Sequence, residues 1–91
     1  MIEVRRISGG NPVHFEVIVR DGTGKTHHDV TLDFENLAHA DCTAEQYIKA
    51  AFCFLLDRES KEAILKRFDI SLITRYFPEF PNEIRRYLPA D

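Results

Sequence analysis

Hydrophobic and polar residues alternate along the first third of the chain. In the stretch VHFEVIVR, at residues 13–20, every second residue is apolar: Val13, Phe15, Val17 and Val19. Neighbouring side chains of a strand point to opposite faces, so this pattern is typical of a strand with one buried face. It predicts a strand over residues 13–20.

Two similar stretches flank this strand. IEVRRIS, at residues 2–8, and KTHHDVTLDF, at residues 25–34, also alternate. The two glycines of DGTG favour a tight hairpin turn between the second and third stretches. If Arg20 pairs with Lys25, the apolar faces of the strands coincide. The predicted core side of the third strand then carries Thr26, His28, Val30, Leu32 and Phe34.

The opposite face of this predicted sheet is mostly polar. The register places Arg5, Glu16 and Asp29 in one row, so that one arginine lies beside two carboxylates. Ile7 and Ile18 fall on the same face, either as ordinary exposed residues or as the centre of a contact with a partner. The first and third strands form the predicted edges, whose unpaired backbone groups offer a route to association.

A helical pattern begins after Thr43. The stretch TAEQ fits a capping box, in which the Thr43 hydroxyl accepts from the backbone of Gln46 and the Gln46 side chain returns to Thr43. Apolar residues then cover most of the helix circumference, and the polar stripe consists of Glu45, Gln46, Lys49 and Asp57. Such a helix is buried on two sides. The pattern predicts a long helix over residues 44–57, between the sheet and a second layer.

The second layer must come from the rest of the chain. Ser60 and Asp69 are typical N-caps and predict two short helices, the second of them ended by Pro78. A residue before proline favours an extended backbone, so FPEFP, at residues 77–81, predicts an extended link to a last helical turn. The predicted cover of the long helix consists of Phe77, Phe80 and Ile84.

Length and composition agree with one domain over residues 1–91. The chain has 91 residues, 44% apolar and 30% charged. The predicted class is α+β, with a three-stranded antiparallel meander, one long helix and two or three short helices packed on it.

A formal charge of -3 gives no net attraction for nucleic acid or for an anionic bilayer. No apolar run approaches the roughly 18 residues of a membrane span, so we expect a cytoplasmic protein that does not engage a membrane. Cys42 and Cys53 would stand roughly 15 Å apart along the predicted helix, too far for a disulfide. Two reduced thiols fit the same compartment.

Candidate chemistry is sparse. Two sets of residues have the types of metal ligands: His14, His27 and Asp29 on the outer sheet face, and His39, Asp41 and Cys42 in a loop. The loop set lacks a second cluster to complete a tetrahedral site, and whether either set binds a metal stays open. No Ser or Cys has the surroundings of a nucleophile, and DGTGK lacks the spacing of a phosphate loop. We expect no enzyme activity and no cofactor.

Nucleic-acid binding is the alternative function. Residues 61–77, KEAILKRFDISLITRYF, resemble a helix-turn-helix, with ILKRF as the first helix, DIS as the turn and LITRYF as the second helix. The predicted phosphate contacts are Lys61, Lys66, Arg67 and Arg75. Acidic residues in the same region oppose this interpretation.

Protein binding is the leading hypothesis. The C-terminal segment RYFPEFPNEIRRYL is rich in aromatic residues and arginines, which are enriched at protein interfaces. Once the predicted helix cover is set aside, the candidate interaction surface consists of Arg75, Tyr76, Arg85, Arg86 and Tyr87. We therefore expect a small, non-enzymatic interaction or regulatory module, with another protein or a second copy of itself as the partner.

Overall fold

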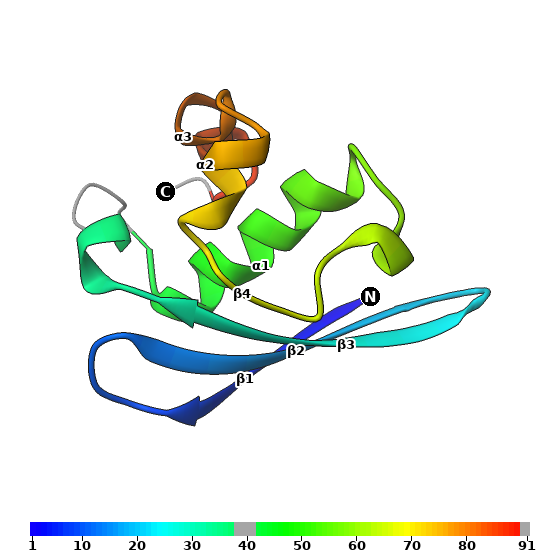
Figure 1. Ribbon diagram of the computed structural model, residues 1–91, viewed down its shortest axis with the longest axis horizontal. Coiled ribbons are helices and arrows are strands. Elements are labelled where there is room, and N and C mark those ends of the chain that lie inside the picture. Colours follow the sequence, from blue (N-terminus) through cyan, green and yellow to red (C-terminus); the bar gives the residue numbers. More distant parts are fainter. Residues whose placement is uncertain (38–41, 90–91) are drawn as a thin grey trace.

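The computed structural model describes residues 1–37 and 42–89. One layer of the fold is a four-stranded sheet in the order β1-β2-β3-β4, and the helices lie on one face of it (Figure 1). The strands are β1 (Ile2–Ser8), β2 (Val13–Asp21), β3 (Gly24–Leu32) and β4 (Arg67–Asp69). The helical elements are α1 (Ala44–Leu56), α2 (Leu72–Tyr76) and α3 (Phe80–Glu83), with 3-10 turns η1 (Phe34–Leu37), η2 (Lys61–Ala63) and η3 (Ile84–Arg86). The predicted α+β class is confirmed.

The register of the antiparallel meander is also confirmed. Arg20 lies opposite Lys25 in the β2–β3 pair. On the outer face Arg5 lies opposite Glu16 and donates to its carboxylate over 2.9 Å, and Glu16 in turn lies opposite Asp29. As the pattern predicts, every second side chain of β2 from Val13 to Val19 is buried in the core.

The third strand is shorter than predicted. It ends at Leu32, and Phe34, expected on the core side, lies in η1 and is 50% exposed. The Asp33 carboxylate accepts from the backbone N–H of Glu35 over 2.9 Å. An aspartate turn of this kind competes with the strand ladder, and here it ends the strand before Phe34.

The first helix of the helix-turn-helix interpretation, over residues 64–68, is wrong, because the chain forms the strand β4 at Arg67–Asp69. This fourth strand pairs in parallel with β3, with Phe68 opposite Val30. The Phe68 ring lies 6.0 Å from that of Phe52 in α1, and the Thr31 hydroxyl donates to Asp69 over 2.6 Å. Polar and apolar side chains alternate in β4, which consists of Arg67, Phe68 and Asp69. Three residues are too few for this alternation to be recognised in the sequence. The edge strands are therefore β1 and β4, and β3 lies inside the sheet.

The long helix begins as predicted. Thr43 accepts from the backbone N–H of Gln46 over 3.1 Å, and the Gln46 side chain accepts from the Thr43 N–H over 2.9 Å. Ile48 and Phe52 are fully buried, and α1 lies across the sheet (Figure 1). Phe54 is fully buried as well, toward the C-terminal layer.

That C-terminal layer supplies the second cover of α1. The Phe54 ring meets Phe77, Phe80 and Tyr87 at centroid distances of 5.8, 4.9 and 5.9 Å, each nearly edge-on. Such contacts add to the burial of apolar area. The prediction that Phe77 and Phe80 pack on the helix is confirmed.

Two local predictions in the C-terminal half need correction. Phe80 does not belong to an extended link but begins α3. Pro81 lies in the first turn of that helix, where a missing N–H breaks no helical bond. Ser60 precedes only the single turn η2, with no side-chain cap bond, because the chain then extends toward β4.

Candidate functional site

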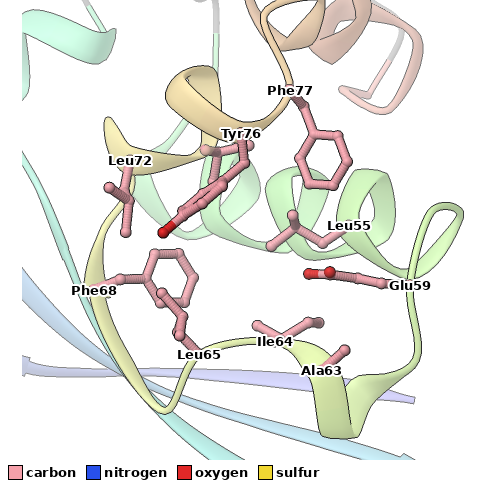
Figure 2. Close-up of a pocket in the computed structure, with 10 residues that line it drawn as sticks. Leu55, Glu59, Ala63, Ile64, Leu65, Phe68, Leu72, Tyr76 and Phe77 are labelled. Atoms are coloured by element: carbon pink, nitrogen blue, oxygen red, sulfur yellow. The ribbon is translucent and has the colours of Figure 1, made fainter.

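A cleft opens between the C-terminal end of α1, the segment leading to β4, and α2. It has a volume of about 390 Å³, within the roughly 300–1,000 Å³ of typical ligand sites. We call it the main cleft, and its lining residues are Leu55, Glu59, Ala63, Ile64, Leu65, Phe68, Leu72, Ile73, Tyr76 and Phe77. All but Glu59 and Tyr76 are entirely apolar. Figure 2 shows these side chains converging from α1, the η2–β4 segment and α2.

One wall of the main cleft is held in place by Lys61. Its side chain is only 2% exposed, and Nζ lies 2.9 Å from Asp21, 2.7 Å from Glu62 and 2.7 Å from the Thr23 hydroxyl. The bond to Glu62, followed by that to Asp21, raises the pKa of Lys61 above its ordinary value. Lys61 lowers the pKa of Asp21 in return. The bonds to Asp21 and Thr23 fasten η2 to the β2–β3 hairpin, directly before Ile64 and Leu65.

A buried histidine supports the same wall. His28 Nδ1 lies 2.8 Å from the Leu65 carbonyl, and Nε2 lies 2.8 Å from the Thr26 hydroxyl. A carbonyl only accepts, so Nδ1 carries the proton and Nε2 accepts from Thr26. Burial lowers the pKa of His28 below its ordinary value, which favours this neutral form. The arrangement holds Leu65 at the rim of the cleft.

The opposite wall of the main cleft is formed by α2. The short link between β4 and α2 sets the position of this helix. The Asp69 carboxylate accepts from both the backbone N–H and the hydroxyl of Ser71, at 3.0 and 2.6 Å. This turn starts α2 directly after β4, and Ile73 packs into the core. Leu72 and Tyr76 are then left on the side of α2 that lines the main cleft.

The rim of the cleft exposes large apolar groups. Leu65 is 48% exposed and Tyr76 is 66% exposed. The Glu59 carboxylate projects into the opening near Leu55 and Ile64 (Figure 2). Neither a thiol, an imidazole nor an amine lines the cleft. Its almost entirely apolar lining suits the binding of an apolar group.

The candidate interaction residues lie on different features of the structure. Tyr76 lies on the main cleft and Arg75 is exposed beside it in sequence. Arg85 lines a second cleft of about 270 Å³ instead. Arg86 is exposed and pairs with Glu83 over 3.0 Å.

Tyr87 contributes to the fold itself. It is half-buried against Phe54, and its hydroxyl donates to Asp57 over 2.6 Å. The bond to Asp57 raises the pKa of Tyr87. Arg58 lies 3.6 Å above the Phe54 ring and pairs with Glu79 over 3.2 Å, so it ties the same layer to α1. Replacing Tyr87 would therefore disturb packing as well as any interface.

The helix-turn-helix prediction is wrong in its geometry. Its first helix, over residues 64–68, does not form, since this stretch leads into the strand β4, and only the second is a helix, α2. Lys61, one of the four predicted phosphate contacts, is buried in ion pairs. Lys66, Arg67 and Arg75 are exposed. They lie on the stretch before β4, on β4 and on α2, not on a recognition helix pair.

The candidate metal ligands are only partly described. His39 and Asp41 lie outside the described residues, and Cys42 is half-buried. On the sheet, His14 lies 3.7 Å from Asp29, whereas His27 lies 3.9 Å from Glu16. Within residues 1–37 and 42–89, no group of three such side chains is arranged to hold a metal ion. Cys53 has a free thiol, so the disulfide to Cys42 excluded by spacing does not form.

The main cleft was missed by sequence reasoning apart from Tyr76. Leu65 lies between Ile64 and Lys66. The charged and apolar residues of this stretch fit a helix as well as they fit an extended chain. Glu59 has no distinguishing neighbours in the sequence. The one available signal was the run Ala63, Ile64, Leu65 and Phe68, which holds more apolar residues than a short surface turn requires.

Comparison with known proteins gives no match: no family model, curated protein or solved structure is significantly similar to this chain. In the part of the chain that the structure describes, every helix is too short or too polar to cross a membrane.

Proposed function

We propose that this protein is a small, non-enzymatic module of the cytoplasm that binds another protein through the main cleft. The observation that carries the proposal is the apolar cleft itself, with Leu65 and Tyr76 exposed on its rim. Protein interfaces concentrate their binding energy in a few residues, with Trp, Tyr and Arg enriched, that pack in well-desolvated pockets. Arg75, next to Tyr76, adds an exposed planar donor of the kind enriched at interfaces.

The cytoplasmic location in this proposal is supported by cysteine chemistry. The chain has two cysteines, and the thiol of Cys53 is free. Reduced thiols are the rule where glutathione and thioredoxin keep the compartment reducing.

The proposal is tested by capture from a native lysate with matched variants. The double variant Leu65→Ser, Tyr76→Ser removes the apolar rim of the cleft. Ile7→Ser is the control, because Ile7 is also 48% exposed but belongs to β1. We expect wild type and Ile7→Ser to retain the same specific partner, and the double variant to lose it. Equal capture by all three proteins, or no specific capture by any, would contradict the proposal.

The mass of the protein in solution separates the two kinds of partner. A second copy of the chain would give a dimer that the double variant converts to a monomer. A monomeric wild type that still captures a partner points to a different protein.

A further inference from the structure

The main cleft contains one charged side chain, that of Glu59. It is half-buried among apolar walls (Figure 2). Two nearby acidic residues are already paired, Glu62 with Lys61 over 2.7 Å and Glu79 with Arg58 over 3.2 Å. Glu59 has no ion pair with any residue that the structure describes. A carboxylate in such a site is complementary to an occupant that carries a positive charge.

The strand β4 borders the cleft and has an open edge. The Ile70 N–H donates to the Thr31 carbonyl over 2.9 Å, and the Asp29 N–H donates to the Lys66 carbonyl over 2.7 Å. In a parallel pair with this pattern, the backbone groups of Phe68 also point toward β3. The N–H and C=O groups of Arg67 and Asp69 therefore point to the opposite, open edge.

The open edge and the cleft meet at one residue. Phe68 lies between Arg67 and Asp69 in β4, and its side chain lines the cleft. A peptide that paired with the open edge would place alternate side chains on the Phe68 side of the sheet. Their spacing along the peptide would be about 6.5–7 Å, from a rise of ~3.2–3.4 Å per residue.

We propose that the main cleft takes an extended peptide segment of a partner protein, which adds to the open edge of β4. An apolar side chain of the segment packs beside Leu65, Phe68 and Tyr76, and a Lys or Arg side chain pairs with Glu59. This inference rests on the proposed function and names the chemistry of its partner. A small amphiphilic amine would pack against the apolar walls and pair with Glu59. It would make no hydrogen bond to the backbone groups at the open edge of β4.

The charge preference is tested with three pools of capped octapeptides on the full chain. Each pool has Leu or Phe at alternate positions and one variable position occupied by Lys, Gln or Glu. Binding is followed by the chemical shifts of backbone amides around the cleft. We expect the Lys pool to bind about 3- to 5-fold more tightly than the Gln pool, as for a partly exposed ion pair, and the Glu pool to bind most weakly.

Matched variants assign that preference to one carboxylate. Glu59→Gln is expected to bind the Lys and Gln pools equally while still binding both. Glu3→Gln, at an exposed position on β1, keeps the preference. An unchanged preference in Glu59→Gln, or no preference in wild type, would overturn the inference.

The strand addition is tested by methylating one backbone nitrogen of the best Lys peptide at a time. Methylation removes a donor, so binding should weaken at alternate positions only, where the peptide N–H faces β4. The same effect at every position, or at none, would overturn the inference. So would 4-phenylbutylamine binding as tightly as the peptide.

Failure of this inference and failure of the proposed function give different results. Peptides that shift the cleft amides without a charge preference, or without the alternate pattern, overturn the inference alone. The proposed function fails when the Leu65→Ser, Tyr76→Ser variant captures the same partner as wild type.

Discussion

Two buried polar residues, Lys61 and His28, hold the η2–β4 segment on the sheet. Counted over the whole residue, Lys61 is 3% exposed and His28 is 2% exposed. Every buried polar atom of both side chains has a hydrogen-bond partner. Burial of a polar group is costly unless its hydrogen bonds are satisfied. Because these partners lie on β2, on the β2–β3 turn, on β3 and on the segment itself, each residue joins distant parts of the chain.

The buried histidine predicts a pH dependence of stability. The pKa of His28 is lowered in the folded state, whereas the unfolded chain has the ordinary value of about 6.5. The unfolded state therefore binds more protons as the pH falls. The stabilisation is fully present above about pH 6.5 and is lost as the pH falls toward the folded-state pKa. The slope contributed by one proton is at most about 1.4 kcal/mol per pH unit.

Urea unfolding between pH 7.5 and 5 checks this expectation. His28→Gln should be less stable than wild type, and its unfolding free energy should vary less with pH in this range. The control His27→Gln alters an exposed histidine on the same strand and should keep the wild-type slope. A slope in His28→Gln equal to that of wild type would contradict the assignment. Carboxylates with lowered pKa values, such as Asp69, change the stability at a lower pH than this range.

At the scale of elements, α1 and β4 form for different reasons. The helix carries its own start signal in the Thr43 and Gln46 capping box, and its apolar residues specify two buried sides. The strand β4 has only three residues and depends on β3 for its hydrogen bonds. An isolated segment of this length has no reason to stay extended.

Hydrogen exchange distinguishes this strand from the helix that the sequence favours. In a helix, consecutive amides are protected alike, whereas an edge strand protects alternate amides. The Ile70 N–H, which donates to Thr31, should exchange much more slowly than the Asp69 N–H, which faces the open edge. Similar protection of both amides, measured by NMR at neutral pH, would argue against β4. Addition of a bound peptide should slow exchange at Asp69.

At the scale of the whole molecule, the layers meet at the buried helix α1. The sheet packs on one side of it, and Phe54 reaches the C-terminal layer on the other. Both walls of the main cleft depend on this arrangement, because Leu55 at the end of α1 lies between them. The cleft is therefore a consequence of how the layers close, and not of any one segment.

Removal of the Phe54 ring should weaken the whole domain. Phe54 is 0% exposed, and a Phe→Ala change at a buried site typically costs about 3–5 kcal/mol. This is a large part of the roughly 5–15 kcal/mol by which a domain is stable. Phe34→Ala is the control, because Phe34 is 50% exposed, and it should cost no more than about 0.5 kcal/mol. Equal losses in denaturant unfolding would show that the C-terminal layer does not pack as described.

The fold was largely predictable, and the candidate site was not. The strands over residues 2–8 and 13–20 and the start of α1 depend on patterns that one short stretch contains. The walls of the main cleft depend on pairs such as His28 with Leu65 and Lys61 with Thr23, which are 37 and 38 residues apart. A periodic pattern within one short stretch cannot indicate contacts between residues so far apart in the sequence.

The sequence by itself therefore determined the meander, its register and a helix buried on two sides, because periodicity and capping act between near neighbours. Only the tertiary structure decided that residues 67–69 join the sheet, that Lys61 is buried and that Tyr76 lines a cleft. Hydrogen bonds and packing between distant segments overrode the local helical preference of residues 61–69. The surface proposed for binding belongs to this second set.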